Sequence, residues 1–391
     1  MKPNITQLIP WFPLKRLIER FYPFNFQEIR ENQSIIDFDI LSFNRRVHWS
    51  IDIIDEFAHL FNWAGISSNP AIPWKESEIA RYGNYFDWTK AANNESFPWT
   101  KYLFFKYKDF IDWAYMDDLP VKLAIDDITY LNKEQRGYMA EFKNVDWSAW
   151  LIERFKDDLD WELLPRNQSI PYSEYFFTAY KDRIYFIDLV TNPWLLRDEN
   201  LSFLDKIAYV DFNNVSQWKQ DWTLDFIEKN KELLNWDLLS SNKYLPWSEE
   251  LLDKYSDRWN WFEMSGHRNF PWSWPIIEMH EHEWNWQDRS DPYISMFRTM
   301  SSNPSLPWSR AFVERFGHYL GFGSTNQVNE DEYQLLFGIS SNRKIDWDLE
   351  FLLKYKERWD LESLGNNEAV YNMVEGNLGN EDLIKFLKVL F

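Results

Sequence analysis

An aromatic residue recurs along this chain at a near-constant interval, usually preceded by proline or aspartate and usually followed by serine or threonine. We call these residues anchors, and they stand at Trp49, Trp74, Trp99, Trp147, Tyr172, Trp222, Trp247, Trp272, Trp308 and Trp347. The intervals between them are 25, 25, 48, 25, 50, 25, 25, 36 and 39 residues. A fixed period of this length is typical of tandem-repeat proteins, in which each unit buries a face against its neighbours.

Two further positions keep the same register as the anchors. A large apolar residue follows every anchor by fourteen positions: Trp63, Trp88, Trp113, Trp161, Phe186, Trp236, Trp261, Trp286, Phe322 and Leu361. Asparagine precedes seven of the ten anchors by five positions: Asn44, Asn69, Asn94, Asn167, Asn242, Asn303 and Asn342. Ten units aligned at three positions indicate a genuine repeat.

The spacing inside a unit predicts two helices. A capping residue follows most anchors, and apolar residues at offsets 4, 5, 8 and 12 (Leu251, Leu252, Tyr255 and Trp259 in one unit) form one stripe on a helix of about three turns. An Asn or Asp at offset 13 then opens a shorter helix, such as 236–240. Because helices below about 12–15 residues are marginal in water, the units must be stabilised by stacking.

These patterns predict an all-α fold, a curved α-solenoid of about 12 stacked two-helix repeats with atypical ends. Residues 1–40 are expected to form an N-terminal capping region, and residues 41–367 the repeat array. Residues 368–391 are expected to close the array with an amphipathic helix that begins near Asn380.

The array is irregular in four places. Residues 114–140 and 187–213 occupy the doubled intervals and are expected to hold degenerate units, while 287–299 and 323–338 are insertions. Insertions in a solenoid often map to its binding face, although they can also be tolerated surface loops.

Composition narrows the classes of partner. With 62 acidic and 42 basic residues the formal net charge is −20, which disfavours nucleic acid and anionic membranes and favours a basic partner. The 24 tryptophans could suggest base stacking, but they occupy core positions and no basic groove accompanies them, so we expect no direct binding of nucleic acid.

The chain contains no cysteine, which excludes disulfides, thiolate metal sites and a cysteine nucleophile. No apolar run is long enough to span a bilayer, and the N-terminus does not have the pattern of a secretory signal. We therefore expect a cytoplasmic protein that neither crosses nor binds a membrane.

One cluster resembles a metal site, the run from His280 to Glu283, with His267 thirteen residues upstream. His280 and His282 are two residues apart and so lie on roughly opposite faces of a helix, unlike the pairs four residues apart that bind zinc. His280 also occupies offset 8, where other units have Tyr or Phe, and His267 occupies the asparagine position. We interpret both as structural substitutions; the alternative is a locally polar pocket.

No catalytic motif stands out from the sequence. The adjacent carboxylates Asp117-Asp118, Asp126-Asp127 and Asp157-Asp158 are expected to be solvated faces of an acidic protein, and neither a P-loop nor a GxSxG or HExxH motif is present. We assign no catalytic, cofactor-binding or metal-binding residues, and we expect a protein that is not an enzyme.

The unit spanning 239–261, with its motif Asn-x-x-x-Pro/Asp-Trp followed by Asn/Asp-Trp, resembles a family of short tryptophan-bearing tandem repeats. These repeats occur in uncharacterised proteins of bacteria and large DNA viruses. The resemblance covers about 41–367 and implies architecture only.

The sequence leaves three functional hypotheses. The first is a non-catalytic scaffold or recognition module that binds a protein, most plausibly a basic one, on a solenoid surface. The second is an acidic inhibitor or immunity-type protein that neutralises a basic target or mimics the charge of DNA. The third is an enzyme of unrecognised type, for which the region of His280 is the sole candidate. The identity of the partner and the oligomeric state are not encoded in any motif that we found.

Overall fold

The computed structural model describes residues 12–208, 210–286, 299–320 and 339–390. Every regular element among these residues is a helix, and the one β-bridge pairs Leu123 with Val145. The fold is therefore all-α, as the sequence predicted. The chain divides into two compact units: unit 1 combines Met1–Asn62 with Trp247–Phe391, and unit 2 comprises Trp63–Pro246.

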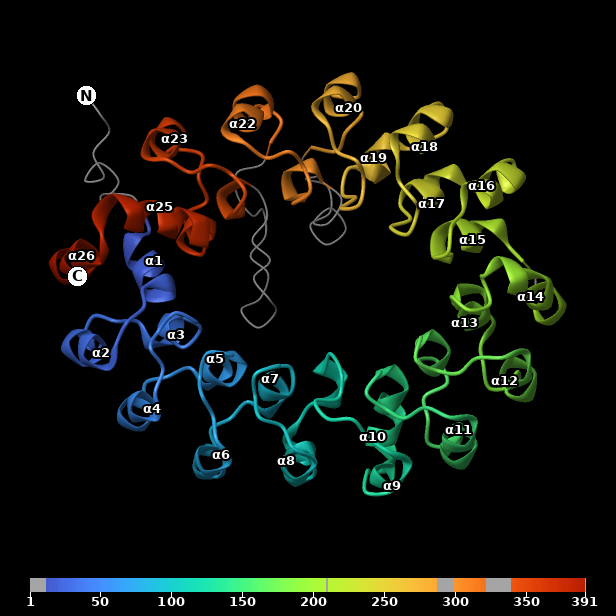
Figure 1. Cartoon of the computed structure of the whole chain (residues 1–391), viewed down its shortest axis with the longest axis horizontal. Coiled ribbons are helices and arrows are strands. Elements are labelled where there is room, and N and C mark those ends of the chain that lie inside the picture. The colour runs from blue at the N-terminus through green and yellow to red at the C-terminus, as the bar shows by residue number, and fades with distance from the viewer. Residues whose placement is uncertain (1–11, 209, 287–298, 321–338, 391) are drawn as a thin grey trace. The chain divides into compact units, whose positions relative to one another are not determined.

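In unit 2, the helices that follow an anchor position form what we call the first layer (Figure 1). They are α6 (Glu76–Tyr82), α8 (Lys101–Tyr107), α9 (Ile125–Ile128), α11 (Ala149–Phe155), α12 (Glu174–Ala179), α14 (Leu201–Ile207) and α16 (Leu224–Asn230). The second layer contains α5 (Trp63–Ser68), α7 (Trp88–Ala92), η3 (Trp113–Tyr115), α10 (Lys133–Tyr138), η4 (Met139–Glu141), η5 (Leu164–Arg166), α13 (Phe186–Thr191), α15 (Phe212–Trp218) and α17 (Trp236–Ser240). Neighbours in the second layer pack on one another, as α5 does on α7 and α15 on α17.

Unit 1 is built from the same two kinds of helix. Its N-terminal part contains α1 (Leu14–Phe21), α2 (Phe26–Asn32), α3 (Phe38–Leu41) and α4 (Ile51–Phe57). Its C-terminal part contains α18 (Glu249–Lys254), α19 (Trp261–Met264), α20 (Trp274–Met279), η7 (Met300–Ser302), α22 (Arg310–Phe316), η8 (Ile339–Ser341), α23 (Leu349–Lys354), α24 (Leu361–Gly365), α25 (Glu368–Leu378) and α26 (Asn380–Leu390).

Side-chain caps determine where the helices begin. The hydroxyl or carboxylate that follows an anchor accepts a hydrogen bond from the N–H three residues along the chain, as Thr100 does from Leu103. The same cap is formed by Ser148, Ser173, Thr223, Ser248, Ser309 and Asp348. Ser50, which follows the anchor Trp49, does not make this bond. At offset 13 the predicted second cap forms at Asp87, Asp112, Asp160, Asn235, Asn260 and Asp360.

The first helices are shorter than the three turns that the apolar stripe suggested. In α18 the helix ends at Lys254, and Tyr255 already has non-helical angles (φ −127°, ψ 30°). The indole of Trp259, at offset 12, then folds back and donates to the Leu252 carbonyl at 3.3 Å. That carbonyl is one of the four that a helix leaves unpaired at its C-terminus. The last apolar residue of the stripe therefore lies in a loop that caps the helix, and the helix itself does not extend to it.

Contacts between aromatic rings join several repeat units to the next. The tryptophan at offset 14 is covered by the ring at offset 8 of the following unit, as Trp88 is by Tyr107 with centroids 3.7 Å apart and planes at 15°. The same pairing joins Trp63 to Tyr82 and Trp161 to Tyr180. Such pairs add stability beyond the apolar area that they bury.

A recurring asparagine, which in seven repeat units stands five residues before the anchor, forms a second link between repeat units. The side-chain nitrogen of Asn44 donates to the carbonyls of Glu19 and Tyr22, both at 2.9 Å, while its side-chain oxygen accepts from the Arg46 N–H. The Asn44 carbonyl accepts from the anchor indole of Trp49. The donation to the preceding unit recurs at Asn94, Asn167, Asn192, Asn242, Asn303 and Asn367. We call this series the asparagine ladder.

In unit 1, helices from the two ends of the sequence pack together. Helix α1 contacts α24 and α25, and the ring of Phe21 lies 5.7 Å from that of the fully buried Tyr371. Arg46 donates to Glu368 at 2.7 Å, across 322 residues of sequence. The N-terminal helices are thus stabilised by contacts with the C-terminal ones.

The irregular segments have different outcomes. Residues 114–140 contain α9, α10 and most of η4. Residues 187–213 contain most of α13 and all of α14, so both segments hold helices. The inserted residues 287–298 and 323–338 lie outside the described part of the chain.

Among the described residues, no helix combines the length and apolarity needed to cross a membrane.

Replacing Asn242 by alanine is expected to destabilise the protein by about 2–4 kcal/mol, because the buried carbonyls of Ser216 and Lys219 and the N–H of Tyr244 all lose a partner. Urea unfolding followed by circular dichroism measures the change. The exposed Asn377, changed in the same way, should have an effect below about 0.5 kcal/mol. Equal effects of the two substitutions would contradict the ladder's role.

Candidate functional site

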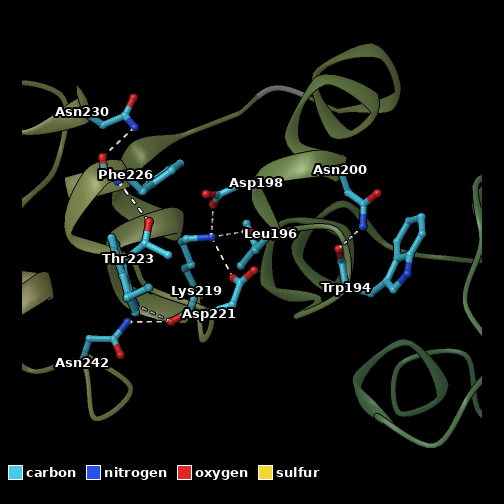
Figure 2. A network of polar contacts seen from close by, with 11 residues as sticks. Trp194, Leu196, Asp198, Asn200, Lys219, Asp221, Thr223, Phe226, Asn230 and Asn242 are labelled. Atoms are coloured by element: carbon cyan, nitrogen blue, oxygen red, sulfur yellow. Dashed lines mark hydrogen bonds and ion pairs between the residues drawn. The ribbon is translucent and has the colours of Figure 1, made fainter. Parts of the chain in front are cut away.

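The least expected buried group in unit 2 is the ammonium of Lys219, whose side chain is fully buried. It lies just after α15 and donates to the Leu196 carbonyl at 3.1 Å, to Asp198 at 2.5 Å and to Asp221 at 2.7 Å (Figure 2). An ammonium has three N–H donors, and three acceptors surround this one. Lys219 therefore has no donor left for a ligand.

The position of Lys219 explains why a cation is buried there. The anchor Trp222 has glutamine five residues before it in place of the ladder asparagine, and its indole donates to the Lys219 carbonyl. The Lys219 ammonium reaches a carbonyl of the preceding unit, as a ladder asparagine does, and the Lys219 carbonyl in turn accepts from Asn242. Lysine thus continues the ladder, with two aspartates neutralising its charge.

Substitution of Lys219 by methionine is expected to cost about 2–4 kcal/mol of unfolding free energy, because it leaves the Leu196 carbonyl unpaired and removes the charge that faces Asp198 and Asp221. Both aspartates are about half exposed, and water partly replaces the lost contact, so the figure stays below that for a fully buried pair. Chemical denaturation measures it, with the exposed Lys206→Met as the control. An unchanged midpoint for Lys219→Met would refute this role.

The two histidines singled out from the sequence lie in different surroundings. His280 stacks on Trp261 with centroids 3.5 Å apart and planes at 14°, the contact that Tyr107 makes with Trp88. His267 is buried edge-on against Trp247, and its carbonyl accepts from the anchor Trp272 as an asparagine carbonyl does. Within the described ranges, no three His, Asp or Glu side chains converge as a metal site requires.

Because His280 occupies a stacking position, His280→Tyr is expected to leave stability within about 0.5 kcal/mol of the wild type, whereas His280→Ala should cost about 1–2 kcal/mol. Thermal unfolding of the three proteins distinguishes them. If tyrosine were as damaging as alanine, a function of the imidazole other than stacking would be indicated.

The adjacent carboxylates are held by neighbouring parts of the chain. One oxygen of Asp118 accepts from three backbone N–H groups, those of Leu119, Lys143 and Asn144. Ion pairs with basic residues of nearby elements hold three others: Lys101–Asp127, Arg183–Asp157 and Arg136–Asp158. These carboxylates connect successive units.

The framework described so far does not account for three aromatic residues of the first layer. Tyr102, Trp150 and Tyr175 are 63%, 58% and 76% exposed, and each is the second residue of its helix, α8, α11 and α12 respectively. They share one repeat position, three residues after an anchor. In the other anchored units that position holds Asp52, Ser77, Asp225, Glu250, Pro275, Ala311 and Glu350.

Basic side chains lie over two of these rings. The Arg154 guanidinium lies 5.2 Å from the ring centre of Trp150, and the Lys106 ammonium lies 6.0 Å from that of Tyr102. Each cation is four residues beyond its ring, one turn along the same helix. The rings are thus oriented by a neighbour but remain exposed to solvent.

These three residues do not stand out in the repeat pattern, because they occupy a position at which the repeat units differ. What distinguishes them in the sequence is a difference between repeat units. They are aromatic at a position where the other anchored units have a polar or small residue. Position in the repeat separates these three from the many buried aromatics.

None of the family models, curated proteins and solved structures compared with this chain matches it.

Proposed function

We propose that this protein is a non-catalytic scaffold that binds another protein on the surface of an α-solenoid of about 12 stacked two-helix repeats. The repeated contacts between units support the solenoid part of the proposal. Several repeat units are joined to the preceding one by the same kind of ring contact and by the same asparagine donation. A surface made of repeated helices offers equivalent positions along its length that can vary independently of the framework.

The observation that carries the binding function is the exposure of Tyr102, Trp150 and Tyr175. Tyrosine and tryptophan are enriched at protein interfaces because they combine a large apolar surface with a polar edge and lose little conformational entropy on binding. Three of them at one repeat position, on helices of one layer, form a surface that folding itself does not need.

The acidic-inhibitor hypothesis also remains open as a second candidate, and the net charge of −20 is what favours it. It differs from the scaffold in its expected response to salt. Binding dominated by exposed charge weakens strongly when salt screens it, whereas binding centred on aromatic contacts weakens less.

The triple variant Tyr102→Ser, Trp150→Ser and Tyr175→Ser is expected to lose its specific partners, because buried aromatic contacts carry much of the affinity of an interface. The immobilised chain is exposed to lysate of its source cells, and retained proteins are quantified against the wild type. A variant with three other exposed tyrosines of unit 2 replaced, Tyr115→Ser, Tyr185→Ser and Tyr244→Ser, should retain the same proteins.

Both variants should keep the wild-type circular dichroism spectrum, because all six side chains are exposed. If the two variants retain the same proteins as the wild type, the proposed surface is wrong. If the wild type retains nothing above background, the binding function itself is contradicted.

A further inference from the structure

The first-layer face formed by α8, α9, α11 and α12 carries a row of exposed side chains on the second residue of each helix. These residues are Tyr102, Asp126, Trp150 and Tyr175. We infer that this row, called here the α8–α12 face, binds an extended basic segment of a partner protein that carries arginine or lysine together with proline. The inference rests on the proposed function and adds the chemistry of the partner.

Contacts between neighbouring helices hold the row in place. The rings of Phe105 and Tyr130 join α8 to the end of α9 at 5.9 Å, and Lys101 of α8 pairs with Asp127 of α9. Tyr180 donates to Glu153 at 2.8 Å and so joins α12 to α11. The segments that lead into α9 and α11 are paired by the bridge between Leu123 and Val145. A face fixed in this way binds with little loss of its own conformational entropy.

The charged groups on this face favour a cation as the ligand. The carboxylates of Asp126 and Glu174 are exposed, and neither has an ion pair or a side-chain hydrogen bond within the described residues. Asp126 lies between the two aromatic positions on α8 and α11, and Glu174 is adjacent to Tyr175. A combination of exposed carboxylates and aromatic rings suits a ligand lysine or arginine, because its cation can form an ion pair with a carboxylate or lie over a ring.

The cations of the face do not favour an acidic ligand. Arg154 and Lys106 lie over the rings of Trp150 and Tyr102, so their positive charge is already directed at an aromatic surface of this chain. They also lie one helical turn from the row of second residues. An acidic segment along the row would face the exposed carboxylates of Asp126 and Glu174.

The distribution of the row over four successive helices favours an extended ligand. Packed helices lie about 8–10 Å apart, and a polyproline II helix advances about 9.3 Å in each turn of three residues. A ligand in that conformation can place one side chain on each helix of the row, and about nine to ten residues cross all four helices. Proline-rich segments use this conformation when they dock on exposed aromatic rings.

The test uses the full-length chain and two fluorescein-labelled peptides, one of three Pro-Pro-Arg repeats and one of three Pro-Pro-Glu repeats. Fluorescence anisotropy at about 50 mM salt, where screening is modest, should show binding of the arginine peptide and none of the glutamate peptide. Asp126→Asn combined with Glu174→Gln should weaken the arginine peptide at least about fivefold, because two charge-assisted contacts are lost. Trp150→Ser should weaken it at least about tenfold, as expected of a central aromatic contact.

The matched control is Asp225→Asn combined with Glu250→Gln, which removes two exposed carboxylates from the second residues of α16 and α18, the position that Asp126 has in α9. This variant should bind within about twofold of the wild type, since long-range effects of two exposed charges are small. Equal weakening by both pairs would show that net charge, and not the α8–α12 face, attracts the peptide. That result would overturn the inference, as would the absence of any arginine-peptide binding.

Two further measurements separate this inference from the proposed function. If the arginine peptide fails to bind but the triple aromatic variant still loses its captured proteins, the face binds a partner of different chemistry and only the present inference is wrong. If sedimentation shows a dimer of the chain that Trp150→Ser abolishes, the occupant is a second copy, which also overturns it. If the triple variant loses no protein, the proposed function itself fails.

Discussion

A buried side-chain amide is the interaction on which the rest of this structure depends. Asparagine is suited to the ladder because one short side chain supplies an acceptor for its own turn and a donor for the preceding unit. An aspartate would place a negative charge against backbone carbonyls, and a serine would not reach across the interface. Where Gln217 stands at the ladder position, Lys219, two residues further along, supplies the donor to the preceding repeat unit, and two aspartates neutralise its charge.

The ladder acts together with the stacked rings and gives the many tryptophans a structural explanation. Trp63, Trp88, Trp161, Trp261 and Trp286 each meet a ring of the next repeat unit, which is a tyrosine, a phenylalanine or, at His280, an imidazole. A flat ring is sufficient for this contact, which is why histidine is tolerated there. An abundance of aromatic residues is therefore no sign of a ligand site in this chain, and functional positions have to be sought where the framework leaves the choice of residue free.

Local patterns in the sequence predicted local structure well. The all-α class and most of the predicted caps followed from short-range chemistry, because an N-cap and its N–H partner are three residues apart. The length of the first helices was not predicted correctly. The indole of Trp259 folds back on the Leu252 carbonyl, and an apolar residue at that offset fits a non-helical loop as well as a continued helix. The contact between Arg46 and Glu368 was also beyond prediction, since nothing in either local sequence indicates a partner 322 residues away.

The same reasoning explains why the candidate surface was missed and why it is informative. A repeat is recognised by what its units share, whereas Tyr102, Trp150 and Tyr175 are visible only as differences between units. Their exposure leaves apolar area in water without any gain in the stability of the fold, so their presence at one repeat position calls for a role outside folding. The net charge indicates only that a partner should be basic, because it acts over the whole molecule. In the proposed α8–α12 face that preference becomes local, because Asp126 is on α9, between α8 and α11 in the chain, and Glu174 precedes Tyr175 on α12.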